Sequence, residues 1–238
     1  MKKYIPDCIT SMNLCFGVIG VVFAFKGRLD IAFILMLAAG VADFLDGFAA
    51  RLLGAYSDLG KELDSLSDLV SFGVLPGVML YTLSRNCMFG ESWTAWVPLV
   101  ALSLASALRL AKFNVDTRQS AGFLGLPTPA SALIAGSLCY FVAVAPGSFL
   151  ATWCAGPVFL PVLSVCLAAL MLSEIPMFSF KFHKDDPKIL KNKRMAFAIL
   201  VIAATLLCVL LRLDWSAGVL TVMTGYVLKN LIYAIAKI

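Results

Sequence analysis

Charged residues are scarce in this chain. Asp, Glu, Lys and Arg together make up 14% of the 238 residues, whereas 61% are hydrophobic and the mean hydropathy is +0.93. Soluble proteins contain about 25% charged residues, and a water-soluble fold cannot hide so much apolar surface. The composition therefore excludes an ordinary soluble protein and predicts a polytopic helical membrane protein.

Zinc ligands, disulfide patterns and linkers are missing as well. The chain has one histidine, His183, and its seven cysteines show no CxxC or Cys/His spacing, so we predict neither a zinc site nor a disulfide framework. No Gly/Ser linker or repeat divides the chain, which predicts a single integral domain over residues 1–238. No A-x-A-like site follows the first apolar run, so we expect that run to be retained as a helix.

Long apolar runs alternate with short breaks that contain Gly, Pro or charge. Because a helix needs about 20 residues to cross the hydrocarbon core, these runs predict an all-α bundle of about eight transmembrane spans. Pro157 and Pro161 interrupt the sixth span. The predicted spans are residues 8–26, 31–53, 59–83, 94–113, 129–147, 151–173, 196–212 and 215–236.

The lysines and arginines predict the orientation. With the N-terminus inside the cell, only Lys26, Arg28, Arg85 and Arg212 of the 19 basic residues lie on the outer side. This asymmetry predicts that both termini are cytoplasmic. A basic loop at 181–194 suits anionic lipid headgroups, and the net charge of +5 requires no nucleic-acid partner.

Six carboxylates lie between Asp43 and Asp68, which is unexpected in so apolar a chain. Four of them recur at helical spacing along two predicted helices, so each pair shares one face with small residues. These faces comprise Asp43, Asp46, Gly47 and Ala50 on one helix and Gly60, Asp64 and Asp68 on the next. The short turn GAYSD predicts antiparallel neighbours whose acidic faces meet, with Ser57 or Asp58 capping the second of these helices.

Four carboxylates that converge in a membrane repel one another unless cations neutralise them. Mg²⁺ and Mn²⁺ prefer oxygen ligands, and no thiol or imidazole accompanies this cluster. We therefore predict that the four aspartates bind two divalent cations, which keep open positions for phosphate oxygens. Gly47, Ala50 and Gly60 leave room beside the metals for a nucleotide.

The spacing D-x2-D-G-x2-A-R-x8-G-x3-D-x3-D over residues 43–68 resembles, at every fixed position, the signature of the CDP-alcohol phosphotransferases. The resemblance implies a six-helix core with two additional C-terminal helices and a membrane enzyme that displaces CMP from a CDP-linked lipid with an alcohol. It implies a two-metal centre at the four aspartates with Asp68 as the general base. It also implies nucleotide or diphosphate contacts at Asn13, Gly47, Ala50, Arg51, Ser57 and Gly60.

Two further segments, LRLAKFN at 108–114 and FLGLPTPAS at 123–131, resemble the membrane-embedded phosphatidylserine synthase branch of this family. PDCITSMNLCFG near the N-terminus also resembles it, although that branch has Asn where Asp7 stands and Arg where Lys112 stands. The resemblance implies that CDP-diacylglycerol and L-serine react to give phosphatidylserine and CMP. It further implies a homodimer in the bacterial inner membrane, with a cytoplasmic active site.

Serine is a zwitterion, so its pocket needs a cation for the carboxylate and an acceptor for the ammonium group. Arg109 and Lys112 lie one turn apart and are candidates for the cation, and Thr128 is a candidate hydrogen-bonding group. These residues place the predicted serine site within residues 108–131. The two basic residues also suit a second role as anchors at the membrane interface.

Two alternatives remain open. The same chemistry with glycerol 3-phosphate or an inositol phosphate as acceptor requires further basic groups, and Arg118 is available. A cation transporter with the aspartates as its transit site belongs to a different functional class. Such a path gains nothing from the adjacent Arg51, which favours an enzyme.

Overall fold

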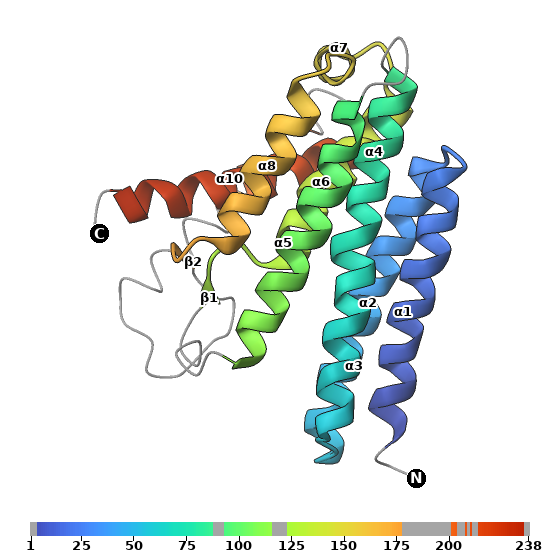
Figure 1. Cartoon of the computed structure of the whole chain (residues 1–238), viewed down its shortest axis with the longest axis vertical. Coiled ribbons are helices and arrows are strands. Elements are labelled where there is room, and N and C mark those ends of the chain that lie inside the picture. The colour runs from blue at the N-terminus through green and yellow to red at the C-terminus, as the bar shows by residue number, and fades with distance from the viewer. Residues whose placement is uncertain are drawn as a thin grey trace.

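Helices make up most of the described chain, as the computed structural model in Figure 1 shows. The structure describes residues 4–87, 93–115, 123–177, 201–203, 208, 210 and 214–235. The elements, in chain order, are α1 (Tyr4–Phe25), α2 (Leu29–Leu53), α3 (Asp58–Asp68), the π-helix η1 (Leu69–Val74), α4 (Leu75–Cys87), the short 3₁₀-helix η2 (Trp93–Ala95), α5 (Trp96–Val115), β1 (Phe123–Leu124), α6 (Thr128–Val144), α7 (Phe149–Cys154), α8 (Phe159–Leu172), β2 (Pro176–Met177) and α10 (Trp215–Ile235).

The predicted helical membrane architecture is confirmed. Among the described residues, five helices are long and apolar enough to cross a membrane, namely those over Tyr4–Phe25, Leu29–Leu53, Asp58–Asn86, Trp93–Val115 and Trp215–Ala234. In Figure 1, α1 to α5 run along the long axis of the molecule, whereas α10 runs across it. Large apolar side chains such as Val22, Val41 and Phe44 are exposed on α1 and α2, as expected for helices that face lipid.

The sixth predicted span was wrong as a single helix. Residues 151–173 divide between α7 and α8, because the chain leaves helical geometry around Gly156 and Pro157. Pro161 lies in the first turn of α8, where its missing N–H costs nothing. Most of the predicted span 196–212, the basic loop 181–194, His183 and Arg118 lie outside the described residues.

Helix α1 packs against both α2 and α3, so it joins the two acidic helices. Its buried stripe recurs every three or four residues and consists of Pro6, Thr10, Asn13, Gly17, Gly20 and Ala24. Ser71 in η1 donates a hydrogen bond of 3.1 Å to the backbone carbonyl of Asn13. A Cβ atom on Gly17 would lie 3.1 Å from the Cα atom of Ser71 and would overlap its hydroxyl. Glycine therefore permits the closest approach between α1 and η1.

Asp68 is the last residue of α3, and the helix continues without a break through η1 into α4. The π-helix was not predicted from the sequence. Single π-turns inside α-helices are uncommon and frequently occur at functional sites. Here the π-turn follows directly after the last aspartate of the acidic stretch.

A small antiparallel ribbon closes the other side of the bundle. Phe123 pairs with Met177, and Leu124 pairs with Pro176. Gly125 has a φ of +74°, and a Cβ atom there would lie 2.6 Å from the carbonyl oxygens of Met171 and Ser173. The ribbon therefore fixes the Gly-Leu-Pro-Thr-Pro segment against the end of α8 and places Thr128 at the start of α6.

Gly17→Ala is expected to destabilise the fold, because its methyl group overlaps Ser71 at the α1–η1 contact. Overpacking of this kind costs about 1–3 kcal/mol, which corresponds to a fall of several degrees in the Tm of the detergent-solubilised protein. Gly147→Ala is the matched control, since a Cβ atom at Gly147 meets nothing within 4 Å. Equal Tm values for the two variants would contradict the packing account.

Candidate active site

Three of the four predicted metal-binding aspartates converge in the structure. One carboxylate oxygen from each of Asp43 on α2 and Asp64 and Asp68 on α3 lies within 4.8 Å of the other two. All three residues are partly buried. Hard divalent cations hold oxygen ligands at about 2.0–2.6 Å, so oxygens on opposite sides of one ion lie about 4–5 Å apart. The cluster therefore has the dimensions of a metal site.

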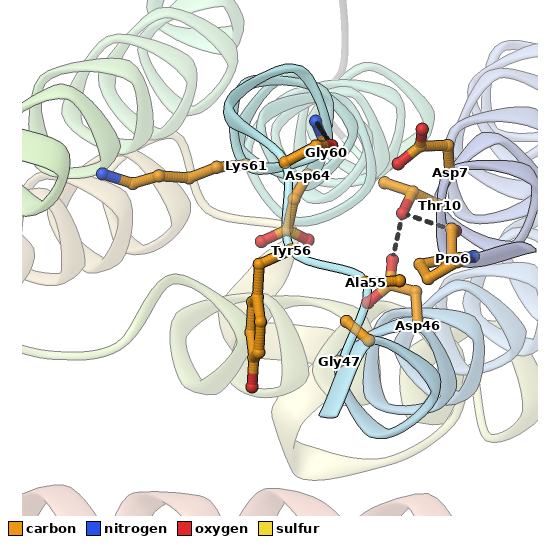
Figure 2. A pocket seen from close by; sticks show the side chains of 12 residues that line it. Pro6, Asp7, Thr10, Asp46, Gly47, Ala55, Tyr56, Gly60, Lys61 and Asp64 are labelled. Carbon is orange, nitrogen blue, oxygen red and sulfur yellow. Dashed lines mark hydrogen bonds between the residues drawn. The ribbon is translucent and has the colours of Figure 1, made fainter. Parts of the chain in front are cut away.

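The fourth aspartate, Asp46, takes a different partner. Its Oδ2 accepts a hydrogen bond of 2.6 Å from the Thr10 hydroxyl, and the residue is only 6% exposed. Figure 2 shows Asp46 and Thr10 pointing toward one another across the wall between α2 and α1. Asp46 thus lies beside the three-aspartate cluster and lines the adjacent cavity together with Asp64.

Asn13 positions the last aspartate. Its Nδ2 donates a hydrogen bond of 3.2 Å to Asp68 Oδ1, and the side chain is completely buried. Asp64 Oδ1 is also buried and has no hydrogen-bond partner within the described part of the chain. An unpaired, buried carboxylate oxygen is costly, and a bound cation would remove that cost. The residues present therefore fit a divalent metal ion.

A cavity of about 220 Å³ opens next to the aspartates, between α1, α2 and the start of α3. Figure 2 shows the side chains that surround it. Its lining residues are Pro6, Asp7, Thr10, Asp46, Gly47, Ala50, Ala55, Tyr56, Ser57, Gly60, Lys61 and Asp64. The lining therefore includes two of the predicted metal ligands, Asp46 and Asp64. It also includes four of the predicted nucleotide contacts, namely Gly47, Ala50, Ser57 and Gly60.

The two glycines of the cavity have different roles. A Cβ atom on Gly47 would meet nothing within 4 Å, so this position leaves open space, as the sequence predicted. A Cβ atom on Gly60 would lie 2.8 Å from Asp7 Oδ1 and 2.9 Å from Ser57 Oγ. Gly60 therefore permits the first turns of α1 and α3 to approach one another.

Ser57 and Arg51 lie at the edge of the site. Ser57 is the N-cap of α3 and accepts a hydrogen bond of 2.9 Å from the Gly60 amide, which confirms the capping prediction. Arg51 is exposed in the last turn of α2 and does not line the cavity. Its proposed contact with a diphosphate stays a prediction.

The sequence argument missed six residues of the cavity lining: Pro6, Asp7, Thr10, Ala55, Tyr56 and Lys61. Pro6, Thr10 and Asn13 recur at helical spacing on the buried stripe of α1, and this pattern was a signal for Thr10. Tyr56 is exposed, and its ring extends away from the aspartates in Figure 2. Nothing in its local pattern distinguishes it from a surface residue.

Arg109 and Thr128, two of the predicted acceptor-binding residues, are in contact. Arg109 is 8% exposed, and its Nη1 donates a hydrogen bond of 3.3 Å to Thr128 Oγ1. The Nε and Nη2 atoms of Arg109 are buried and have no partner among the residues that the structure describes. Lys112 is instead exposed and forms a salt bridge of 3.2 Å with Glu174. The structure thus brings Arg109 and Thr128 together and places Lys112 apart from them.

Contacts between α5 and the α3–α4 span place Arg109 at the depth of Asp68. At one end, Asn114 donates a hydrogen bond of 2.9 Å to Ser65. At the other, a Cβ atom on Gly73 would lie 2.7 Å from Ser106 Cβ. Arg109 lies between Ser106 and Asn114, and Asp68 lies between Ser65 and Gly73. The backbone positions of Arg109 and Asp68 therefore lie at about the same level of the bundle.

Comparison with known families places this acidic site in context. A family model described as CDP-alcohol phosphatidyltransferase matches residues 3–163, which include all four aspartates and both α1 and α5. The chain belongs to the CDP-alcohol phosphatidyltransferase family. The predicted resemblance is thereby confirmed for α1–α6, and α10 lies beyond the matched residues.

Several members of the family with assigned names are similar to the chain. A CDP-diacylglycerol–serine O-phosphatidyltransferase of Bacillus subtilis is 30% identical over 77% of this chain and 95% of its own length. One of Mycobacterium leprae is 35% identical over 74% of this chain, but the match spans only 58% of that protein. An archaetidylserine synthase of Methanothermobacter thermautotrophicus is 36% identical over 56% of each chain.

Asp64→Asn is expected to stabilise the metal-free protein and to abolish its stabilisation by metal. Without a cation, removing one of three crowded carboxylates relieves repulsion, whereas with Mn²⁺ a ligand is lost. Tm values in EDTA and in Mn²⁺ measure both effects, with Glu62→Gln as an exposed acidic control on the same helix. The metal-site interpretation fails if Mn²⁺ raises the Tm of Asp64→Asn as much as that of the wild type.

Proposed function

We propose that the protein transfers the phosphatidyl group of CDP-diacylglycerol to L-serine and releases CMP. The convergence of Asp43, Asp64 and Asp68 from two helices is the observation that carries this proposal. The names of the similar proteins from Bacillus subtilis and Mycobacterium leprae support serine as the acceptor. The chemistry is a displacement at the lipid-side phosphorus, with CMP as the leaving group.

We propose two Mg²⁺ or Mn²⁺ ions as the cofactors, with Asp43, Asp46, Asp64 and Asp68 as their protein ligands. When bound, such ions neutralise charge on the diphosphate and on the departing CMP. Asp46 already borders the cavity, and a cation would compete with its hydrogen bond from Thr10. Asp64 Oδ1 has no hydrogen-bond partner among the described residues, so it is available to a cation.

Different parts of the site bind the nucleotide and activate the serine hydroxyl. The cavity beside Gly47 and Ala50 accommodates the cytidine part of the substrate, next to the aspartates that face its diphosphate. Asp68 takes the proton from the serine hydroxyl as that oxygen attacks phosphorus, and the bond from phosphorus to the CMP oxygen breaks. Asn13 holds Asp68 in place through its hydrogen bond of 3.2 Å.

Arg109 and Thr128 are the proposed binding residues for serine, which is the acceptor of the phosphatidyl group. Nη1 of Arg109 is bound to Thr128, and the adjacent Nε and Nη2, which have no partner within the described residues, can bind a carboxylate in a bidentate manner. Lys112 has a weaker case, because it is exposed and paired with Glu174. Its role is limited to attracting the anionic CDP-diacylglycerol electrostatically.

The active site faces the cytoplasm in this proposal. Arg51, Lys61 and Lys112 lie near the end of the bundle that carries the cavity, as positive charge on the cytoplasmic side requires. The nucleotide then enters from water while the acyl chains stay in lipid. A bacterial inner membrane location and a homodimer, both implied by the family resemblance, stay predictions.

The purified protein is expected to make phosphatidylserine and CMP from CDP-diacylglycerol, L-serine and Mn²⁺. Lipid analysis with labelled acceptors, supplied one at a time, measures this directly, and EDTA should stop the reaction. Transfer to glycerol 3-phosphate or to an inositol phosphate instead of serine would refute the acceptor while keeping the chemistry. Cation flux in liposomes without CMP release would refute the enzyme.

Asp68→Asn is expected to lower the rate of CMP release by about 10²-fold or more, the usual cost of losing a general base. The asparagine keeps an oxygen for the hydrogen bond with Asn13, so the Tm in EDTA should not fall. Glu62→Gln, an exposed substitution on the same helix, should retain normal turnover. Near-normal CMP release by Asp68→Asn would rule out the base assignment.

A further inference from the structure

The C-terminal helix α10 lies beyond the segment that defines the family, yet it reaches the acceptor side of the site. It packs against α6, which begins at Thr128, and against β2 of the ribbon. Tyr226, in the middle of α10, is 3% exposed and belongs to the same buried cluster as Leu126 and Met177. α10 therefore adds a polar aromatic side chain to the interior of the bundle.

Tyr226 and Arg109 are electrostatic neighbours. The guanidinium charge of Arg109 acts on the phenol of Tyr226, although the two residues come from α5 and α10. Arg109 in turn binds Thr128 at 3.3 Å. Arg109 thus has polar neighbours on two other helices, Tyr226 on α10 and Thr128 on α6.

The Nε and Nη2 atoms of Arg109, which have no partner among the described residues, indicate which kind of ligand binds beside them. Nε and Nη2 lie on one side of the planar guanidinium and donate in parallel, which matches the two oxygens of a carboxylate. Two buried donors without a partner in the described segments are costly. A small carboxylate-bearing ligand removes this cost, as the serine of the proposed function does.

An amino acid whose carboxylate binds Arg109 also brings a positive charge close to the guanidinium. Its ammonium group lies one carbon from the carboxylate, so it also enters the space around Arg109 and needs an acceptor to offset the nearby guanidinium. A tyrosine supplies both a phenolic oxygen and a ring face for a cation.

We propose that Tyr226 is a specificity-determining residue that accepts the ammonium group of the acceptor amino acid. This inference rests on the proposed function and adds a selection rule to it. Arg109 selects the carboxylate, and Tyr226 selects for the ammonium group against alcohols that lack it. The helix outside the family-defining segment thereby sets which alcohol the shared chemistry uses.

Tyr226→Phe tests this rule, because it removes one oxygen and keeps the packing of the ring. The KM for serine of the full-length protein, assayed with CDP-diacylglycerol and Mn²⁺, is expected to rise about tenfold or more, as for a lost hydrogen bond to a charged group. Inhibition by 3-hydroxypropanoate, which has the carboxylate and hydroxyl of serine but no ammonium group, is expected to change less than about twofold by the same reasoning. Tyr233→Phe on the same helix is the matched control and should leave both values unchanged.

A second measurement uses the wild-type protein alone. Serine is expected to bind at least about tenfold more tightly than 3-hydroxypropanoate. An unchanged KM in Tyr226→Phe, or an equal loss of serine and 3-hydroxypropanoate binding, would overturn the inference while the proposed function stands. A wild-type protein that releases CMP but uses no amino acid as acceptor would overturn both.

Discussion

The repulsion between carboxylates is the constraint on which the architecture depends. Asp43, Asp64 and Asp68 come from two helices that have little direct backbone contact, and their oxygens still lie within 4.8 Å of one another. Helix α1 supplies the attraction that opposes this repulsion, because its small, polar stripe packs on α2 and on the α3–η1 span at once. The acidic cluster is thus formed where packing forces like charges together, a state that a bound cation would stabilise.

The two sides of Asp68 have different chemical character. The cavity lies on the side of α1 and α2. Asp7 and Ser57 line it, and a Cβ atom on Gly47 would meet nothing within 4 Å. On the side of α5 lies the buried guanidinium of Arg109 with its bond to Thr128. Asn13 holds Asp68, and the neighbouring Asp46 and Asp64 line the cavity. In the proposed displacement, the nucleophile would approach phosphorus on one side while the leaving group departs on the other.

Much of this could be predicted from the sequence. Hydropathy and spacing gave the helices, and the i, i+3 and i, i+4 pattern of aspartates gave their shared faces, because helical periodicity is a local property. The hydrogen bond from Thr10 to Asp46 depends on how α1 packs, and no local pattern encodes it. The same holds for the salt bridge that occupies Lys112 and for the proximity of Tyr226 to Arg109, which joins residues more than a hundred positions apart. The break between α7 and α8 was missed because apolar composition continues across it.

The π-turn after Asp68 also constrains how the gene for such a protein can change. In η1 the chain uses an extra residue per turn, so α4 is rotated relative to the aspartates of α3. Deleting one residue between 69 and 74 and returning to α-helical geometry would leave α4 facing much as it does now, whereas deleting one residue within α3 would turn everything beyond it by about 100°. The serine and glycine that contact α1 and α5 would then face other neighbours. Chain length is therefore less free to vary during evolution within α3 than within η1.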